Sequence, residues 1–319
     1  MGQAQLSLLG EVKAPIAVAY GGGVDSTAML VGLAQRDIRP DLILFADTGS
    51  EKQETYDFLP LMQAWLKKVG FPPIVTVRYM AKNFKNWPPY YTLTDNVLTN
   101  GTLPGISMGP ASYSLKWKQA PQHASIKAWQ PAIDAWRAGL QVIKLIGFDN
   151  SPRDRRRTYS ANPKDRHLYD YRAPLQEWGW DRDECKKQIE AAGLPVPPKS
   201  ACFFCLSTKT WELDQYPANL LRKIVQIEAR ANPRLRTCEG LWRTTVKGTR
   251  GGEARPGSMT EYILQKGLLP EVEIEHIWQA TPKDIVSFQE GYAKALAKGE
   301  AAQFMSDNWA LDYRTIKAA

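Results

Sequence analysis

Short apolar runs in the first half of the chain predict buried β-strands, and amphipathic helical patterns follow the first two of them. Strands that alternate with helices are typical of a parallel sheet covered by helices on both faces. We therefore expect an α/β fold with a Rossmann-like, doubly wound parallel sheet. The predicted strands are Ile16–Tyr20, Leu42–Ala46, Ile74–Arg78 and Val142–Gly147.

Two features interrupt this pattern. The helix predicted over Gln53–Val69 contains Pro60, which lacks an amide hydrogen, so we expect a kink or a late start there. The stretch between Asn83 and Pro110 is rich in Asn, Pro, Gly and Thr and has no clear period. Long excursions of this kind inside a compact domain are often functional.

Beyond residue 160 the pattern changes to helices alone. Asp181-Arg-Asp-Glu184 predicts a helix start and Gly193 its end, and two further helices are predicted over Ala218–Ala231 and Thr281–Ala297. We therefore expect two domains: an α/β domain over residues 1–160 and a smaller, mainly helical domain over residues 161–319.

The composition is that of a soluble globular protein, with 44% hydrophobic and 23% charged residues among 319. No stretch is long and apolar enough to span a membrane, and the first residues lack a signal-peptide pattern, so we expect a cytoplasmic protein. The net charge of +8 permits an anionic partner without requiring one. Basic residues gather at Arg153–Arg157 and around Lys247–Arg255, which are either binding surfaces or solvated faces.

The segment Pro15–Leu30 joins an apolar strand to a helix through three consecutive glycines, Gly21 to Gly23. Glycines allow a tight turn and bring backbone N–H groups close to a ligand, and a helix start attracts phosphate. The segment is neither a Walker loop nor a Rossmann fingerprint, because no Gly-Lys-Ser/Thr follows and Ser26 occupies the place of the third glycine. It predicts a phosphate-binding loop, with an ordinary strand-to-helix turn as the alternative.

A second motif follows the second strand, and the two together carry a resemblance to a known family. Gly21-Gly-Gly-Val-Asp-Ser26 resembles the pyrophosphate loop (PP-loop) of the adenine nucleotide alpha hydrolases, usually Ser-Gly-Gly-x-Asp-Ser. Phe45-Ala-Asp-Thr-Gly-Ser-Glu51, with Glu54-Thr55-Tyr56, resembles the second motif of the phosphoadenosine phosphosulfate (PAPS) reductase family. The chain departs from the first motif at Gly21, which removes one hydroxyl contact to phosphate.

The resemblance implies that the loop holds the β- and γ-phosphates of ATP while an acceptor is adenylylated and pyrophosphate leaves. Backbone N–H groups, the hydroxyls of Ser26 and Thr27 and the helix dipole would stabilise the leaving charge. Asp25 either orients Mg²⁺ or caps the helix. ATP and Mg²⁺ are thus the expected cofactors. The predicted nucleotide-binding residues are Tyr20, Gly21, Gly22, Gly23, Val24, Asp25, Ser26, Thr27, Ala46, Asp47, Thr48, Gly147, Asp149 and Arg153.

The last of these residues and a lysine pair complete the candidate site. Gly147, Asp149 and Arg153 follow the fourth strand, where the family places a glycine, an acid and an arginine beside the nucleotide. Lys116 and Lys118 either neutralise a phosphate or begin a solvated helix. The predicted catalytic residues are Asp25, Ser26 and Lys116.

All four cysteines lie in the second half of the chain, where Cys202 and Cys205 form a C-x-x-C pair. This spacing favours a metal or redox role over a structural disulfide in a cytosolic protein. Cys185 and Cys238 would have to converge on the pair to complete a site for Zn²⁺ or an iron–sulfur cluster. A persulfide carrier and simple burial are the alternatives.

Three functions follow from these features. The first is an ATP pyrophosphatase that adenylylates a nucleotide or nucleic-acid acceptor, DNA or tRNA, in the manner of a sulfurtransferase supplied by a sulfur-donor protein. The second is a sulfonucleotide (PAPS) reductase, but the family's nucleophilic cysteine near the C-terminus has no counterpart after Cys238. The third is a non-catalytic nucleotide-binding module. Assembly as a homo-oligomer is left open.

Overall fold

The computed structural model describes residues 12–82, 90–104, 112–157, 165–249, 251–281, 285–301 and 303–304. Contacts within the chain divide it into two compact units, each built from two segments of sequence. Unit 1 takes its residues from 1–79 and 115–201, and unit 2 takes its residues from 80–114 and 202–319. This division differs from the predicted boundary after residue 160, because residues 165–201 pack with the N-terminal sheet.

Unit 1 contains a five-stranded parallel sheet with the order β3-β2-β1-β4-β5, so the chain has the predicted α/β, Rossmann-like fold. The first four strands lie where the apolar runs predict them, within one residue at each end. The fifth strand was not predicted. The strands are β1 (Ile16–Tyr20), β2 (Leu42–Asp47), β3 (Ile74–Arg78), β4 (Val142–Ile146) and β5 (Tyr169–Arg172).

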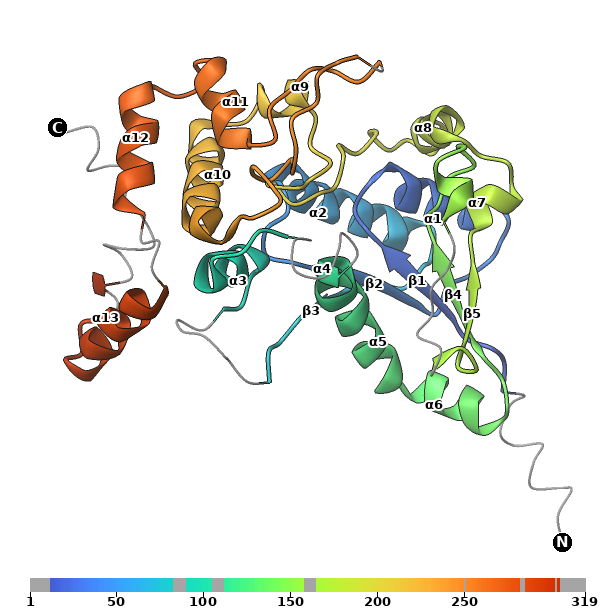
Figure 1. Cartoon of the computed structure of the whole chain (residues 1–319). Coiled ribbons are helices and arrows are strands. Elements are labelled where there is room, and N and C mark those ends of the chain that lie inside the picture. Colours follow the sequence, from blue (N-terminus) through green and yellow to red (C-terminus); the bar gives the residue numbers. More distant parts are fainter. Residues whose placement is uncertain are drawn as a thin grey trace, which may run out of the picture. The chain divides into compact units, whose positions relative to one another are not determined.

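Helices cover both faces of this sheet (Figure 1). On one face α1, α2 and α8 form the larger core with β1 and β2 around buried side chains such as Met29, Phe45 and Ile189. On the other face α5 and α6 pack over Ala17, Leu44 and Val142. The unit 1 helices are α1 (Val24–Gln35), α2 (Gln53–Lys68), α5 (Ala120–Lys127), α6 (Gln130–Arg137), α7 (Pro174–Glu177) and α8 (Arg182–Ala191), with a π-helical turn (Leu115–Gln119) and a 3₁₀ turn (Asp154–Arg156).

Unit 2 is mainly helical and is organised around α10 (Ala218–Ala231), a helix that was predicted with the same bounds. Helices α3, α11 and α12 contact α10, and the buried Arg230 donates from Nε to the Leu98 carbonyl of α3 (3.0 Å). The other helices of unit 2 are α3 (Leu93–Asn100), α4 (Ser112–Ser114), α9 (Thr210–Leu213), α11 (Met259–Gln265), α12 (Glu271–Ala280) and α13 (Ile285–Ala297), with a 3₁₀ turn (Asn232–Arg234).

Two local predictions need correction. Helix α2 continues through Pro60, so the predicted late start is wrong. Its buried face, which includes Phe58 and Met62 on either side of the proline, holds the helix against the core. The stretch after Asn83 contains the helix α3, started by Thr92 and Asp95 in a capping box. Residues 83–89 and 105–111 of that stretch, and residues 282–284 of the last predicted helix, lie outside the described residues.

No helix in the described part of the chain combines the length and the apolar character needed to cross a membrane.

Candidate functional site

The strand order places the candidate site at the point where the sheet reverses its winding. From β1 the chain proceeds to β2 and β3 on one side, and β4 and β5 lie on the other side. Ligands of open α/β sheets bind at the carboxyl ends of the strands beside this reversal. Those ends carry Gly21–Gly23 after β1 and Gly147–Asp149 after β4.

Two of the three loop glycines, Gly22 and Gly23, leave little room for a side chain. Gly22 has φ +72°, a conformation that favours glycine, and a Cβ atom on Gly23 would lie 2.7 Å from Ser200 Oγ. A Cβ atom on Gly147 would lie 2.8 Å from the backbone nitrogen of Ser26. Gly21 differs, since a Cβ atom there meets only ordinary contacts. The close approach of β4 to the start of α1 therefore depends on Gly147.

Ser26 and Thr27 both use their hydroxyl groups inside the protein. Ser26 Oγ accepts from the Gly21 N–H (3.1 Å) and donates to the Gly23 carbonyl (3.2 Å), which fixes the shape of the loop. Thr27 is fully buried, with Oγ1 3.4 Å from the Tyr20 hydroxyl. Both hydroxyls thus have partners inside the protein, and their predicted contacts to phosphate stay predictions.

Helix α1 begins at Val24 without a side-chain cap, since its N-cap residue is Gly23. The first N–H groups of a helix have no partner within it and carry the positive end of the dipole. The glycine loop thus leads directly into an uncapped helix start, which is a favourable place for an anion.

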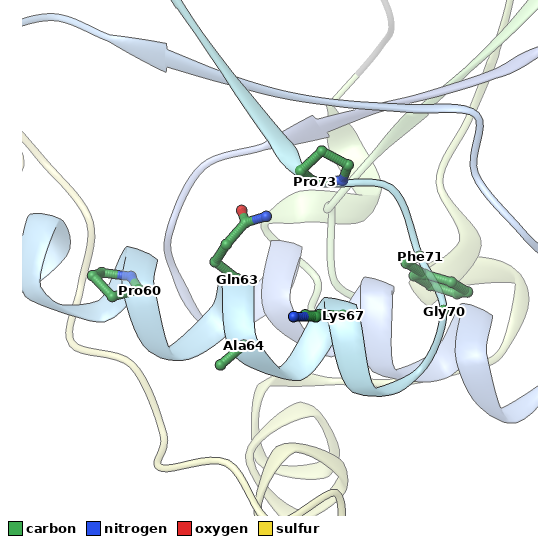
Figure 2. Close-up of a pocket in the computed structure, with 7 residues that line it drawn as sticks. All are labelled: Pro60, Gln63, Ala64, Lys67, Gly70, Phe71 and Pro73. Carbon is green, nitrogen blue, oxygen red and sulfur yellow. The ribbon is translucent and has the colours of Figure 1, made fainter.

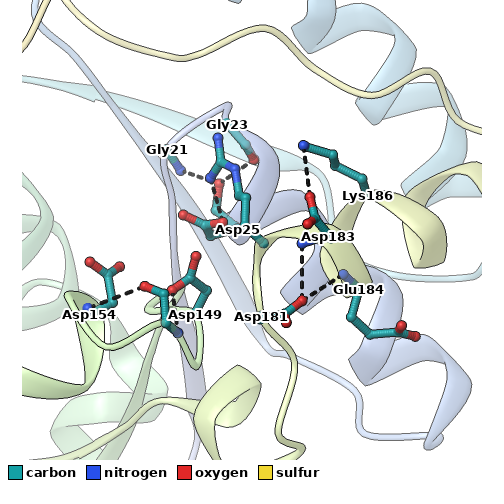
Figure 3. Close-up of polar contacts among 12 residues, drawn as sticks. Gly21, Gly23, Asp25, Asp149, Asp154, Asp181, Asp183, Glu184 and Lys186 are labelled. Carbon is teal, nitrogen blue, oxygen red and sulfur yellow. Dashed lines mark hydrogen bonds and ion pairs between the residues drawn. The ribbon is translucent and has the colours of Figure 1, made fainter.

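Three carboxylates gather beside this helix start (Figure 3). One oxygen each from Asp25, Asp149 and Asp154 can be chosen so that all three lie within 4.8 Å of one another. Within the described residues this is the only group of three or more Asp, Glu, His or Cys side chains at that spacing. Hard oxygen ligands of this kind suit Mg²⁺, which is usually held by one or two carboxylates together with phosphate oxygens.

The surroundings make these carboxylates costly to ionise together. Burial raises the pKa of Asp25, and the neighbouring charges of Asp149 and Asp154 raise it further. Arg182, at the start of α8, opposes this effect through an ion pair with Asp25 (Nη1 to Oδ1, 2.6 Å). Burial also raises the pKa of Asp154, which pairs with Arg157 (3.1 Å). A divalent cation would relieve the repulsion that remains.

Local hydrogen bonds hold the second and third carboxylates in place. Asp149 Oδ1 accepts from the Ser151 N–H (2.9 Å) in the turn after β4. Gln176 donates from Nε2 to the backbone carbonyls of both Asp149 (3.3 Å) and Asp154 (3.1 Å). The turn therefore presents both carboxylates from a braced backbone.

The second motif is tied into the sheet by its own contacts. Asp47 Oδ1 accepts from the Tyr56 hydroxyl (2.8 Å) and the Gly49 N–H (2.8 Å), while Oδ2 pairs with Arg78 of β3 (2.7 Å). Glu51 is buried and pairs with Lys118 (2.8 Å). The motif after β2 is thus a rigid turn at the carboxyl end of the sheet.

The remaining predicted residues take different positions. Ala46 is buried at the end of β2, and Val24 is buried at the start of α1. Arg153 is exposed and influences Asp154 through its charge. Lys116 lies with Nζ 4.9 Å from the centre of the Tyr79 ring, and burial lowers its pKa. Its catalytic role stays a prediction.

The four cysteines are divided between the two units, with Cys185 in unit 1 and Cys202, Cys205 and Cys238 in unit 2. Cys185 is fully buried in the core between α1 and α8, and burial raises the pKa of its thiol to about 12. Cys202 and Cys205 lie in a turn of unit 2, closed by a hydrogen bond from the Cys205 N–H to the Cys202 carbonyl (3.0 Å). A thiolate in the apolar core of Cys185 would lack solvation. Metal binding by Cys185, Cys202, Cys205 and Cys238 stays a prediction.

Sequence reasoning missed three side chains of the site. Asp154 stands within the basic run Arg153–Arg157, and only its spacing of five residues from Asp149 hints at a shared turn. Arg182 follows the correctly predicted N-cap residue Asp181, but its pairing with Asp25 spans 157 residues of sequence. Ser200 has no local signal at all, since its contact with the glycine loop is purely tertiary.

Two further side chains with shifted pKa values, Lys144 and His123, lie on the α5 face of the sheet. Lys144 of β4 is 3% exposed, and burial lowers its pKa to about 7. His123 of α5 stacks on Tyr169 and its Nε2 is 3.1 Å from the Tyr171 hydroxyl; burial and the charge of Lys144 lower the pKa of His123 to about 4. These groups belong to the α5 side of the core, away from the glycine loop.

A hollow of about 620 Å³ lies along α2 and the turn into β3 (Figure 2). Gly70, Phe71 and Pro73 form its wall just before β3 begins, so it lies at the amino end of that strand. Lys67 is the only charged group among its lining residues. The hollow is therefore at the amino end of the strands, whereas the glycine loop is at their carboxyl end, and the hollow brings no reactive groups together.

Comparison of the chain with protein-family models gives no match, and comparison with curated proteins gives none either.

Proposed function

We propose that this protein is a PP-loop ATP pyrophosphatase, similar to the PAPS reductase family, that adenylylates an acceptor and releases pyrophosphate. The observation that carries the proposal is the meeting of the glycine loop, the uncapped start of α1 and Asp149 beside the winding reversal of the sheet. A phosphate chain in this position would receive backbone N–H groups from the loop and the positive end of the helix dipole.

The donor set fits Mg²⁺ bound together with phosphates. Asp25, Asp149 and Asp154 would hold the ion, and Mg²⁺ would supply charge that draws electrons from the phosphates. Because Arg182 pairs with Asp25, its guanidinium lies next to the same position and can neutralise part of the pyrophosphate charge. Gly21–Gly23 would orient the leaving group, so that the α-phosphorus faces the acceptor.

The acceptor in this proposal is a nucleotide or nucleic acid that is activated for replacement by sulfur. Support comes from the basic balance of the chain and from the cysteines of unit 2, Cys202, Cys205 and Cys238, as candidate sulfur carriers. A sulfur-donor protein would supply the sulfur.

The test is turnover of α-labelled ATP with Mg²⁺, with and without DNA or tRNA, and separation of the products. We expect AMP and pyrophosphate, or an adenylylated acceptor, from the unaltered protein. Asp25→Ala and Asp149→Asn should abolish turnover, whereas Asp134→Asn, a change of a half-exposed side chain on α6, should leave it intact.

Binding measurements separate the alternatives. ATP binding without turnover on any acceptor would favour a nucleotide-binding module. Binding of PAPS without binding of ATP would contradict the proposal and favour a sulfonucleotide reductase.

A further inference from the structure

Unit 2 contains a basic hairpin, residues 243–255. In the sequence it comes after α10 and before α11, and it is drawn in orange in Figure 1. Val246 and Arg255 pair as antiparallel partners, with hydrogen bonds of 2.8 and 3.0 Å between their backbones. Arg250 lies outside the described residues.

A buried carboxylate closes the base of this hairpin. Glu228 of α10 is 1% exposed and accepts from both ends of the segment. Its Oε1 accepts from the N–H groups of Leu241 (2.6 Å) and Met259 (3.0 Å), and its Oε2 accepts from the Ser258 hydroxyl (2.6 Å) and the Thr260 N–H (2.8 Å). Four hydrogen bonds to one carboxylate fix the two ends of the hairpin against α10.

A second carboxylate acts at the next level of the hairpin. Glu239 accepts from the Thr245 N–H (3.1 Å), the Thr245 hydroxyl (2.5 Å) and the Gly257 N–H (3.2 Å). Gly257 permits this approach, since a Cβ atom there would lie 2.7 Å from Glu239 Oε2. Glu239 thus ties Thr245 in the first half of the hairpin to Gly257, just after its end.

The hairpin also carries backbone strain in a basic residue. Arg243 has φ +73°, one of two non-glycine residues with positive φ in the described chain. Such conformations are costly, and they persist where the surroundings enforce them, often at binding sites. The Glu239 N–H donates to the Arg243 carbonyl, and this bond belongs to the enforcing contacts.

The charge of the hairpin is one-sided. Residues 243–255 include four basic residues and one acidic residue, Glu253. Arg243 and Lys247 are exposed, and in the described chain neither forms an ion pair. Gly248, Gly251 and Gly252 at the tip leave the backbone open to close approach.

The hairpin is joined to the C-x-x-C turn through a buried tryptophan. Arg255 lies over the Trp242 ring, with Cζ 4.8 Å from its centre, and Trp242 Nε1 donates to the Thr208 carbonyl (2.8 Å). The Thr208 N–H in turn donates to the Cys205 carbonyl (3.0 Å). A partner on the hairpin would therefore lie in the same unit as Cys205, a short chain of contacts away.

We propose that hairpin 243–255 binds the phosphodiester backbone of a nucleic acid. A merely solvated basic loop gains nothing from two anchoring carboxylates and a strained arginine, whereas fixed cations on a narrow ribbon match a line of phosphates. The shared chemistry is the phosphodiester chain, which DNA and RNA both supply. The inference rests on the proposed function only in naming the acceptor class, because binding is measured without ATP.

The experiment is fluorescence anisotropy with labelled single-stranded DNA, duplex DNA and an RNA hairpin, without nucleotide, between 50 and 200 mM salt. The variant is Arg243→Gln/Lys247→Gln. The matched control is Lys67→Gln/Lys68→Gln, which removes two exposed charges from the end of α2. Thermal melts of both variants show whether the fold is kept.

The slope of log K against log salt is negative, and we expect it to become less steep in the hairpin variant. The change should be about 1.8 for duplex DNA or about 1.4 for single strands. Its affinity at 0.1 M salt should fall on the order of tenfold or more. The control should keep both values, and the preferred nucleic acid identifies the source of the backbone.

An unchanged slope in the folded hairpin variant would overturn the inference, as would absence of binding by the unaltered protein. Equal binding of polyglutamate would overturn it in favour of an acidic protein partner. Failure of ATP turnover with intact, hairpin-dependent binding would instead count against the proposed function alone.

Discussion

At the scale of single residues, the candidate site is a balance of charges. Burial raises the pKa of both Asp25 and Asp154, and the charge of Asp149 raises it further. Arg182 opposes the rise at Asp25, and Arg157 and Arg153 oppose it at Asp154. The cluster is therefore destabilising when it is empty and fully ionised, and it favours a cation.

The charge balance predicts a crossover in stability for Asp149→Asn, which keeps the oxygen that accepts from Ser151. In EDTA the variant should be more stable than the unaltered protein, because one repulsive charge is gone. In Mg²⁺ at ten times its Kd the unaltered protein should gain about 1.4 kcal/mol and overtake the variant. Thermal or urea melts in both conditions measure this, and an equal response to Mg²⁺ in the two proteins would contradict a role for Asp149 in the metal site.

Lys144 predicts a pH dependence with a definite sign. Its folded pKa of about 7 lies below the ordinary value of 10.5, so the unfolded chain binds more protons between these values. This group therefore makes stability rise with pH from about 7 to 10.5 and lowers it at neutral pH. Lys144→Met should stabilise the protein at pH 7 and flatten the profile by about one proton.

Urea melts at pH 7, 8, 9 and 10 measure the slope for Lys144→Met. Lys127→Met, which removes the half-exposed partner of Asp165 beside the same cluster, is the matched control. A profile for Lys144→Met as steep as that of the unaltered protein would mean that Lys144 stays charged in its core.

At the scale of elements, the approach of β4 to the start of α1 is set by glycines with different tolerance. Gly147→Ala should push the two elements apart, because its Cβ atom would lie 2.8 Å from the Ser26 nitrogen. We expect loss of stability by about 1–3 kcal/mol and loss of ATP binding. Gly21→Ser, with only ordinary contacts and a family-like residue, should keep both.

Calorimetric ATP titrations together with melts check this pair of variants. ATP binding by Gly147→Ala at the unaltered affinity would show that the nucleotide does not need the close junction of β4 and α1.

The elements also show what the sequence could predict. Strands β1 to β4 and helix α10 were predictable because each is a regular run of apolar residues with clear ends. Strand β5 was not, since Tyr-Asp-Tyr-Arg is short and polar and becomes a strand only by pairing with β4 at the edge of the sheet. Helix α3 was hidden among Asn and Thr residues, and its capping box signals it better than any hydrophobic period.

The candidate site divides in the same way. The glycine loop and Asp149 lie directly after strands, so sequence order alone indicates them. Arg182 and Ser200 reach the loop only after α8 has packed on α1, and no local pattern encodes that contact. The burial of Cys185 was not predictable, because a packed cysteine and a metal-binding cysteine look alike in sequence.

At the scale of the whole molecule, the chain passes between its two compact units at residues 79/80, 114/115 and 201/202. Strand β5 and helix α8 complete the sheet and the core of unit 1, although both lie beyond residue 160. Unit 1 therefore depends on residues that composition assigns to the second half of the chain.

A fragment of residues 1–160 should accordingly fail to unfold cooperatively, because it lacks β5 and the buried Cys185 and Ile189 of α8. A fragment of residues 1–201 retains both and should show a cooperative transition. Circular dichroism during heating measures the difference. A sharp transition in the shorter fragment would contradict the contact-based division.

The carboxylate of Glu228 has a consequence for how this protein can change over evolution. It accepts hydrogen bonds from Leu241 and from Ser258–Thr260, so a single side chain fixes both ends of the loop between them. When both ends are fixed, doubling the length of a flexible loop adds only about 0.6 kcal/mol of closure entropy. The loop can therefore accept insertions and new sequences while α10 and α11 stay packed, so its binding partner can change in evolution without loss of the fold.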